Sequence, residues 1–172
     1  VNQRWRVLPF EPYDAYTNMA VDEAVSEAVG SGESPPTVRF YRWSSSAASV
    51  GYFQSLGDEV DIKACEKDGV DYVRRRTGGG AVFHDSEGEV TYSVIAPLDV
   101  YPDDLTESYR EICGRVVDAL ASLGVEAEFA PVNDVVVDGR KVSGSAQTRR
   151  KGVLLQHGTV LHSVDTEKMF TY

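Results

Sequence analysis

Residues 133–147 read NDVVVDGRKVSGSAQ, and this stretch decides the fold prediction. Two β-prone runs flank the dipeptide Asp138-Gly139. Asp-Gly in that setting is the strongest short-range signal for a β-hairpin, because a type I′ turn requires positive φ at both central residues. The stretch therefore predicts two antiparallel strands. Gly144, beyond the turn, allows a ligand to approach the backbone closely.

The turn also predicts the register of the hairpin. A two-residue turn pairs Val136 with Lys141 and Asp134 with Ser143, and side chains alternate between the two faces of a strand. One face is then apolar and belongs to the core. The other face carries a lysine, a carboxylate and a hydroxyl, so we expect Asp134 and Ser143 to lie beside Lys141 in a polar site. Lys141 is equally compatible with an ordinary exposed strand position.

The rest of the chain contains strands and helices without strict alternation. Strands are predicted at residues 4–8, 37–43, 47–53, 70–75, 81–84, 89–96, 125–129 and 153–161. Helices are predicted after Asp14 or Thr17, over 61–68, and from Asp104 to Gly124. Strands outnumber helices, so the expected fold class is α+β, with a mixed, largely antiparallel sheet flanked by helices.

Length and composition limit the possible function classes. The chain has 172 residues, of which 42 % are apolar and 26 % are charged, and this fits one globular domain over residues 1–172. The formal net charge of −10 argues against nucleic acid and anionic membranes as partners. No apolar run is long enough to span a bilayer and no secretory signal is visible, so we expect a cytoplasmic protein. Because the last residues resemble a newly capped helix, we expect truncation at Tyr172.

A glycine-rich segment, RRRTGGGA, occupies residues 74–81 directly after a predicted strand. Three glycines remove three Cβ atoms, so the backbone can curve around an anion and point its N–H groups inward. An adjacent guanidinium would add a clamp for phosphate. The spacing matches neither a P-loop nor a dinucleotide fingerprint. A flexible surface loop beside solvated charges explains the segment equally well.

The cysteines and histidines predict no metal centre. Cys65 and Cys113 lie on the apolar faces of predicted helices, so both are expected to be buried, inert thiols. Two cysteines form neither a disulfide framework nor a metal-ligand cluster. His157 and His162 are five residues apart on one strand and therefore face opposite sides. No residue is predicted as a metal ligand.

Several segments together resemble the lipoate–protein ligase family. RRRTGGGAVFHD at 74–85 resembles the family's glycine-loop motif, and NDVVVDGRKVSGSAQ at 133–147 resembles its lysine motif. His157-Gly158-Thr159 matches the family's HGT. NMAVDE at 18–23 and GYFQ at 51–54 resemble two further family segments. The agreement runs in order over nearly the whole chain.

The resemblance implies the biotinyl/lipoyl protein ligase fold, which is distantly similar to class II tRNA synthetase cores. It implies an ATP-dependent lipoate–protein ligase, which converts lipoate and ATP into lipoyl-AMP and then acylates a lysine, with Mg²⁺ accompanying ATP. The implied partners are the lipoyl domains of 2-oxoacid dehydrogenase E2 subunits and the glycine cleavage H protein. Because the chain holds no accessory domain, a separate accessory protein is a further implied partner, and activation of lipoate would depend on it.

By the same resemblance, Lys141 is the catalytic residue, contacting both the lipoate carboxylate and the phosphate. The implied nucleotide- and substrate-binding residues are Arg75, Gly78, Gly79, Gly80, Ala81, Val82, Phe83, His84, Asn133, Asp134, Ser143, Gly144, His157, Gly158 and Thr159. Both steps of such a reaction move negative charge onto oxygen. A fixed cation and backbone N–H groups can stabilise that charge, at about 3 kcal/mol for each positioned donor.

Three alternatives stay open. An octanoyl- or lipoyl-transferase of the same superfamily would work from acyl carrier protein without ATP, and residues 144–158 resemble that branch as well. Such enzymes pass the acyl group through a reactive cysteine, and the expected burial of Cys65 and Cys113 disfavours this route. A biotin ligase would carry a GRGRxxR-like loop. A non-catalytic nucleotide- or lipoyl-domain-binding module would not need Lys141.

Overall fold

The computed structural model describes residues 4–172, and residues 1–3 of the expected domain lie outside this range. The elements in chain order are β1 (Arg6–Val7), β2 (Glu11–Tyr13), α1 (Ala15–Gly30), β3 (Thr37–Trp43), β4 (Ala47–Val50), α2 (Leu56–Glu59), α3 (Ile62–Asp68), β5 (Asp71–Arg74), β6 (Val82–His84), β7 (Glu89–Pro97), η1 (Leu98–Val100), α4 (Leu105–Ser122), β8 (Glu128–Ala130), β9 (Asp134–Val137), β10 (Arg140–Arg150), β11 (Val153–Leu161) and α5 (Thr166–Met169). Here η1 is a single 3₁₀ turn.

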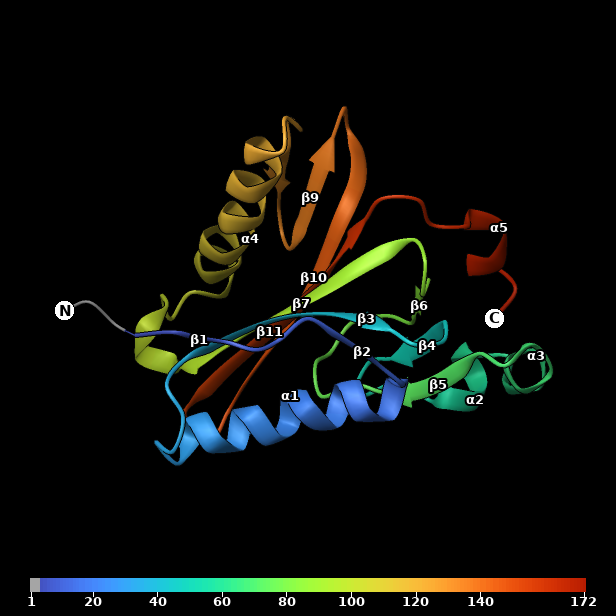
Figure 1. The fold of residues 1–172 in the computed structure, drawn as a ribbon, viewed down its shortest axis with the longest axis horizontal. Coiled ribbons are helices and arrows are strands. Elements are labelled where there is room, and N and C mark those ends of the chain that lie inside the picture. Colours follow the sequence, from blue (N-terminus) through green and yellow to red (C-terminus); the bar gives the residue numbers. More distant parts are fainter. Residues whose placement is uncertain (1–3) are drawn as a thin grey trace.

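A large mixed sheet of eight strands forms the centre of the molecule (Figure 1). Its order is β1-β3-β7-β11-β10-β9-β8, and β2 also pairs with β3. The long strands β7, β11 and β10 run antiparallel, whereas β1 and β2 run parallel to β3. A second sheet of three strands, in the order β5-β4-β6, carries the glycine-rich segment between β5 and β6. The predicted α+β class with a mixed, largely antiparallel sheet flanked by helices is confirmed.

The two long helices cover opposite faces of the large sheet. Ile95 of β7 and Leu155 of β11 belong to a core cluster that also contains residues of α1. The neighbouring residues Val94 and Leu154 belong to a second cluster that contains Ile112 of α4. Because successive side chains of a strand point to opposite faces, the near-continuous apolar runs of β7 and β11 supply both cores.

The three longer helices each begin after an aspartate. The Asp14 side chain accepts a hydrogen bond from the N–H of Thr17 at 2.7 Å, and Asp104 accepts one from Glu107 at 2.9 Å. Asp61 caps α3 in the same way. Such caps satisfy N–H groups that have no partner inside the helix, and the predicted helix starts are confirmed. Within the described part of the chain, no helix has both the length and the apolarity needed to cross a membrane.

Several predicted strands are shorter in the structure, including the one expected over 4–8, which is only Arg6–Val7. The strand expected over 47–53 ends at Val50, because the N–H of Tyr52 turns away to the carbonyl of Thr77 at 2.9 Å. The strand expected over 125–129 begins only at Glu128. The short elements β2 and α2 were not predicted, since three or four residues carry no periodic signal.

The decisive hairpin forms as predicted but contains a bulge. Asp138 and Gly139 have φ values of 50° and 70°, as a type I′ turn requires, and Val136 pairs with Lys141. The register then shifts, so that Ser143 lies opposite Val135 rather than opposite Asp134. One extra residue in a strand moves every later side chain to the other face. The predicted Asp134–Ser143 pair is therefore wrong, and Ser143 faces the core.

Candidate active site

A cavity of about 890 Å³ lies between the two sheets. The glycine-rich segment forms one wall, and residues 144–147 of β10 with 157–159 of β11 form another. Lys141 also lines the cavity, and its side chain is 54 % exposed. Lys141 and the glycine-rich segment, which the resemblance implies as site residues, therefore line the same hollow.

Arg75 holds the glycine-rich segment from the protein interior. Its Nε donates to the Thr77 hydroxyl at 3.2 Å, and its Nη1 donates to the carbonyl and hydroxyl of Ser49 at 3.1 and 3.2 Å. Its Nη2 donates to the carbonyls of Gly78 and Gly80 at 2.8 and 2.7 Å. A guanidinium has five N–H donors, and all five are satisfied by protein acceptors. This geometry makes Arg75 a brace for the loop and leaves it no donor for a phosphate.

Arg75 binds carbonyl groups of the glycine-rich segment and leaves some of its backbone N–H groups free at the cavity wall. The N–H and C=O of one trans peptide unit point in opposite directions, so the N–H groups of Gly79 and Ala81 point away from Arg75. Neither group donates to a protein acceptor within residues 4–172. Gly79 has a φ of 98°, which favours glycine, and a Cβ there would lie 2.9 Å from the Arg75 guanidinium. The segment therefore presents two free N–H donors beside the cavity.

A buried carboxylate anchors a hydrogen-bond network behind this wall. Asp22 of α1 is 1 % exposed and forms an ion pair with Arg39 of β3 at 2.9 Å. The Ser93 hydroxyl donates to both Asp22 oxygens at 2.9 and 2.8 Å. Arg39 also donates to the carbonyl of Asn18 at 2.9 Å. A buried charge is costly unless it is paired and hydrogen-bonded, and this one meets both conditions.

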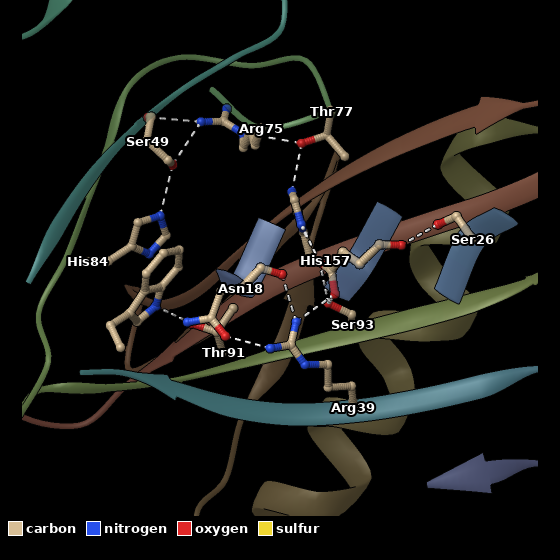
Figure 2. Close-up of polar contacts among 12 residues, drawn as sticks. Asn18, Ser26, Arg39, Ser49, Arg75, Thr77, His84, Thr91, Ser93 and His157 are labelled. Carbon is tan, nitrogen blue, oxygen red and sulfur yellow. Dashed lines mark hydrogen bonds and ion pairs between the residues drawn. The ribbon is translucent and has the colours of Figure 1, made fainter. Parts of the chain in front are cut away.

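A hydrogen-bond chain runs from this carboxylate to the glycine-rich segment (Figure 2). His157 Nδ1 lies 3.2 Å from Asp22 Oδ2, and His157 Nε2 lies 2.7 Å from Thr77 Oγ1. Because the Asp22 carboxylate can only accept, Nδ1 of His157 is assigned the hydrogen, and the Thr77 hydroxyl then donates to Nε2. This series of hydrogen bonds thus connects α1, β11 and the glycine-rich segment through donors and acceptors of fixed direction.

A second chain of hydrogen bonds reaches the Arg75 guanidinium through Ser49. Glu89 is fully buried, and its Oε1 lies 2.8 Å from His84 Nδ1 and 3.0 Å from Trp43 Nε1. His84 Nε2 lies 2.8 Å from the Ser49 hydroxyl, and its ring stacks on Trp43 at 4.1 Å between centroids. The order of groups resembles a serine–histidine–carboxylate triad. Because the Ser49 hydroxyl is buried and already bonded by Arg75, we interpret this chain as a second brace.

The Lys141 side chain lies over later residues of its own strand, β10. Its Nζ is 2.8 Å from Asp134 Oδ1, so the predicted lysine–carboxylate pair is present. A Cβ on Gly144 would lie 2.7 Å from Lys141 Cε and 2.8 Å from Nζ. Gly144 therefore provides the space in which the ammonium rests. Asn133 exchanges hydrogen bonds with the backbone of Ser145, which fixes the strand beneath the lysine.

Most residues implied by the resemblance gather at the cavity. Its lining includes Arg75, Gly78, Gly79, Gly80, Ala81, Val82, Phe83, His84, Asn133, Lys141, Gly144, His157, Gly158 and Thr159. Asp134 reaches the site only through Lys141, and Ser143 is turned away into the core by the bulge. The sequence did not point to Trp43, Glu89 or the role of Thr77, because their contacts depend on strands far apart in the chain.

Both thiols are buried, as predicted, and burial raises the pKa of each. Cys113 lies near the lysine motif, because its Sγ is 3.6 Å from the Ser145 hydroxyl. Cys113 belongs to α4 and does not itself line the cavity, whereas Ser145 does. Within residues 4–172, no three His, Cys, Asp or Glu side chains are grouped so that they could hold a metal ion.

The comparisons with known proteins agree with this arrangement. The sequence model of the lipoyl protein ligase A/B catalytic domain matches residues 14–172. The chain belongs to this family. A solved bipartite lipoate protein ligase from Thermoplasma acidophilum superposes with a TM-score of 0.86 and 33 % identity, over 98 % of this chain and 65 % of that one. The family predicted from the sequence motifs, and the fold that it implies, are confirmed.

Curated members of the family correct the predicted activity. The octanoyltransferase LipM of Symbiobacterium thermophilum is 42 % identical over 188 residues, which cover 96 % of this chain and 68 % of that protein. The LipM of Kyrpidia tusciae is 44 % identical over 192 residues, covering 98 % and 69 %. The chain thus spans about two-thirds of the length of these relatives. Their names overturn the ATP-dependent ligase prediction, together with its lipoyl-AMP, and favour the transferase alternative.

Proposed function

We propose that this chain is an acyltransferase that moves an octanoyl or lipoyl group from the thioester of an acyl carrier protein to a lysine of a lipoyl domain, without ATP. The observation that carries this proposal is the identity of 42–44 % to octanoyltransferases over at least 96 % of the chain. Lipoyl domains of E2 subunits and the glycine cleavage H protein are the acceptors that fit this activity.

The cavity suits a medium-length acyl chain. Its volume of about 890 Å³ falls in the usual range for small-molecule sites, roughly 300–1,000 Å³. Buried Tyr41, Trp43 and Phe83 line it, together with Met19. Burial of each methylene against such walls contributes about 0.8 kcal/mol. The acyl tail would therefore lie among these side chains, with its carbonyl toward Lys141 and the glycine-rich segment.

The reaction that we propose needs no change in oxidation state. The neutral ε-amine of the acceptor lysine attacks the thioester carbonyl carbon, and a C–N bond forms as the oxygen gains negative charge. The C–S bond then breaks, and the leaving sulfur takes up the proton that the amine loses, so the products are an amide and a free thiol. Lys141 and the N–H groups of Gly79 and Ala81 stabilise the oxyanion, each donor contributing about 3 kcal/mol.

The described residues support direct transfer, in which the acyl group passes from the carrier to the acceptor lysine without an acyl-cysteine intermediate. A covalent intermediate would need a thiolate at the cavity, and Cys65 and Cys113 are both buried with raised pKa values. We therefore expect the double variant Cys65→Ser/Cys113→Ser to keep transfer activity, and native protein to keep it after treatment with iodoacetamide. Loss of activity on alkylation of the native protein would contradict direct transfer.

Mass spectrometry of the acceptor tests the function. A lipoyl domain is incubated with the protein and either octanoyl carrier protein, or free octanoate with ATP. The proposal expects an octanoyl mass gain from the carrier without ATP, and at least a hundredfold loss of rate in Lys141→Ala, about the effect of one lost oxyanion donor. The matched control Lys63→Ala removes an exposed lysine from α3 and should keep full activity. A mass gain that requires ATP and free octanoate would refute the proposal.

A further inference from the structure

An exposed phenylalanine lies on the outer side of the glycine-rich segment. Phe53, in the turn between β4 and α2, is 86 % exposed, and its ring contacts that of Tyr52 with centroids 5.0 Å apart. Single apolar side chains on a surface are common and need no explanation. This one is notable for the rigid loop that carries it and for the charges around it.

The loop that presents Phe53 is held in place from one side. Nη1 of Arg74 donates to the carbonyls of Gly51, Tyr52 and Gln54, at 3.0, 3.1 and 2.5 Å. The N–H of Gly51 donates to the Gln54 side chain at 2.8 Å. A side chain on a preformed loop loses little conformational entropy when it is buried by a partner. Phe53 is therefore suited to act as an anchor.

Positive charge gathers around this anchor, although the whole chain carries −10. The guanidinium of Arg150 lies 4.2 Å from the centroid of the Tyr52 ring. Arg150 lowers the pKa of the Tyr52 phenol, and Arg76 and Arg74 act in the same direction. Arg76 also pairs with Glu23 at 2.9 Å. We call the group Tyr52, Phe53, Arg74, Arg76 and Arg150 the Phe53 patch.

The Phe53 patch and the cavity share the glycine-rich segment. The N–H of Tyr52 donates to the carbonyl of Thr77, whose side chain belongs to the buried chain behind the cavity wall. A Cβ on Gly51 would lie 2.1 Å from the carbonyl oxygen of Gly79, so the two loops are in direct contact. Arg75, which braces the cavity wall, stands in sequence between the exposed Arg74 and the half-buried Arg76. A protein docked on the patch would sit beside the loop that carries the proposed oxyanion donors.

We propose that the Phe53 patch docks the protein that delivers the acyl group, an anionic carrier whose thioester arm contains a phosphate. This inference rests on the proposed function. Guanidinium groups match carboxylate and phosphate geometry, and Phe53 supplies an apolar anchor among them. A chain with a net charge of −10 repels an acidic partner at long range, so association requires a local surface of opposite sign.

Binding and turnover are measured separately to test this. Phe53→Ser and Arg150→Glu are compared with wild type by calorimetric titration of octanoyl carrier protein in the absence of acceptor. We expect Kd to rise about tenfold in each variant, with a weaker dependence on salt for Arg150→Glu. Turnover of octanoyl-pantetheine, which has the same thioester without protein or phosphate, should stay within about twofold of wild type. The matched controls are Leu123→Ser and Arg115→Glu, which change an exposed leucine and an exposed arginine at α4.

Three outcomes would overturn the inference, and a fourth would overturn only the proposed function. An unchanged Kd for the carrier in both variants, or no carrier binding by wild type, shows that the Phe53 patch is not the docking surface. Weaker binding of the lipoyl domain with normal carrier binding assigns the patch to the acceptor. Loss of octanoyl-pantetheine turnover shows a role in the reaction itself. If wild type binds the carrier but transfers from no thioester, the proposed function fails while the comparison of Kd values still decides the docking question.

Discussion

The hydroxyl of Thr77 connects His157 to Arg75, and Thr77→Val removes it while keeping the shape of the side chain. The residue is fully buried, so water cannot replace the lost contacts. His157 Nε2 loses a bond of 2.7 Å, and Arg75 Nε loses an acceptor at 3.2 Å. A hydrogen bond to a charged group contributes about 1.5–3 kcal/mol, and an unsatisfied buried donor costs a similar amount. We therefore expect the free energy of unfolding to fall by about 2–4 kcal/mol.

The same substitution should lower activity beyond its effect on stability. Arg75 orients the two peptide units whose N–H groups are the proposed oxyanion donors, and a misplaced donor costs about 3 kcal/mol of transition-state stabilisation, roughly a hundredfold in kcat. KM for the acyl donor should change little, because the acyl tail binds to other walls of the cavity. Thr77→Ser keeps the hydroxyl and is the matched control, with kcat expected near that of wild type.

Guanidinium denaturation and steady-state kinetics, both measured well below the unfolding transition, separate the two effects. If Thr77→Val unfolds at the wild-type denaturant concentration, the hydrogen-bond chain contributes nothing to stability. If it is destabilised but keeps the wild-type kcat, the chain supports the fold without positioning the loop. Either result would refute the reasoning above.

Two further predictions follow from individual contacts. Gly144→Ala places a methyl group within 2.8 Å of Lys141 Nζ and displaces the ammonium. The rate of acyl transfer should therefore fall by about a hundredfold, with little change in melting temperature. A fully active variant would show that the lysine does not act from its observed position. Burial raises the pKa of Tyr101 to about 12, so the folded state holds a proton that the unfolded state loses near pH 10, and stability should fall as pH rises from about 10 to about 12. Tyr101→Phe should flatten this part of the stability–pH curve, and a curve of unchanged slope would contradict the assignment.

Local chemistry explains why much of the fold could be predicted. The turn at Asp138-Gly139, the aspartate caps and the glycine stop after α3 each depend on neighbours within four residues, and these appear where expected. The bulge in β10 could not be predicted, because it depends on which side chains the rest of the sheet can bury. Its effect was large, since Ser143 moved from the predicted site into the core.

Arg75 shows the limit of motif reasoning at the site. An arginine beside three glycines favours a phosphate clamp when only the segment is considered. The hydrogen-bond partner that changes this interpretation is Ser49, which lies 26 residues earlier in the sequence. It contacts Arg75 only when β4 pairs with β5. Sequence spacing identified the loop correctly. The direction of its carbonyls, and therefore of its N–H groups, became visible only with the pairing of those strands.

The two buried chains that meet at Arg75 are costly features for a small protein. Replacing a buried ion pair by well-packed apolar side chains is often neutral or stabilising, so stability alone does not account for Asp22, Arg39 and Glu89 in the interior. Carboxylates fix the direction of the histidines, and the histidines fix the hydroxyls of Thr77 and Ser49. Those hydroxyls leave the guanidinium one orientation, with its remaining donors on the loop carbonyls. We infer that the network serves to orient two backbone N–H groups, which apolar packing cannot do.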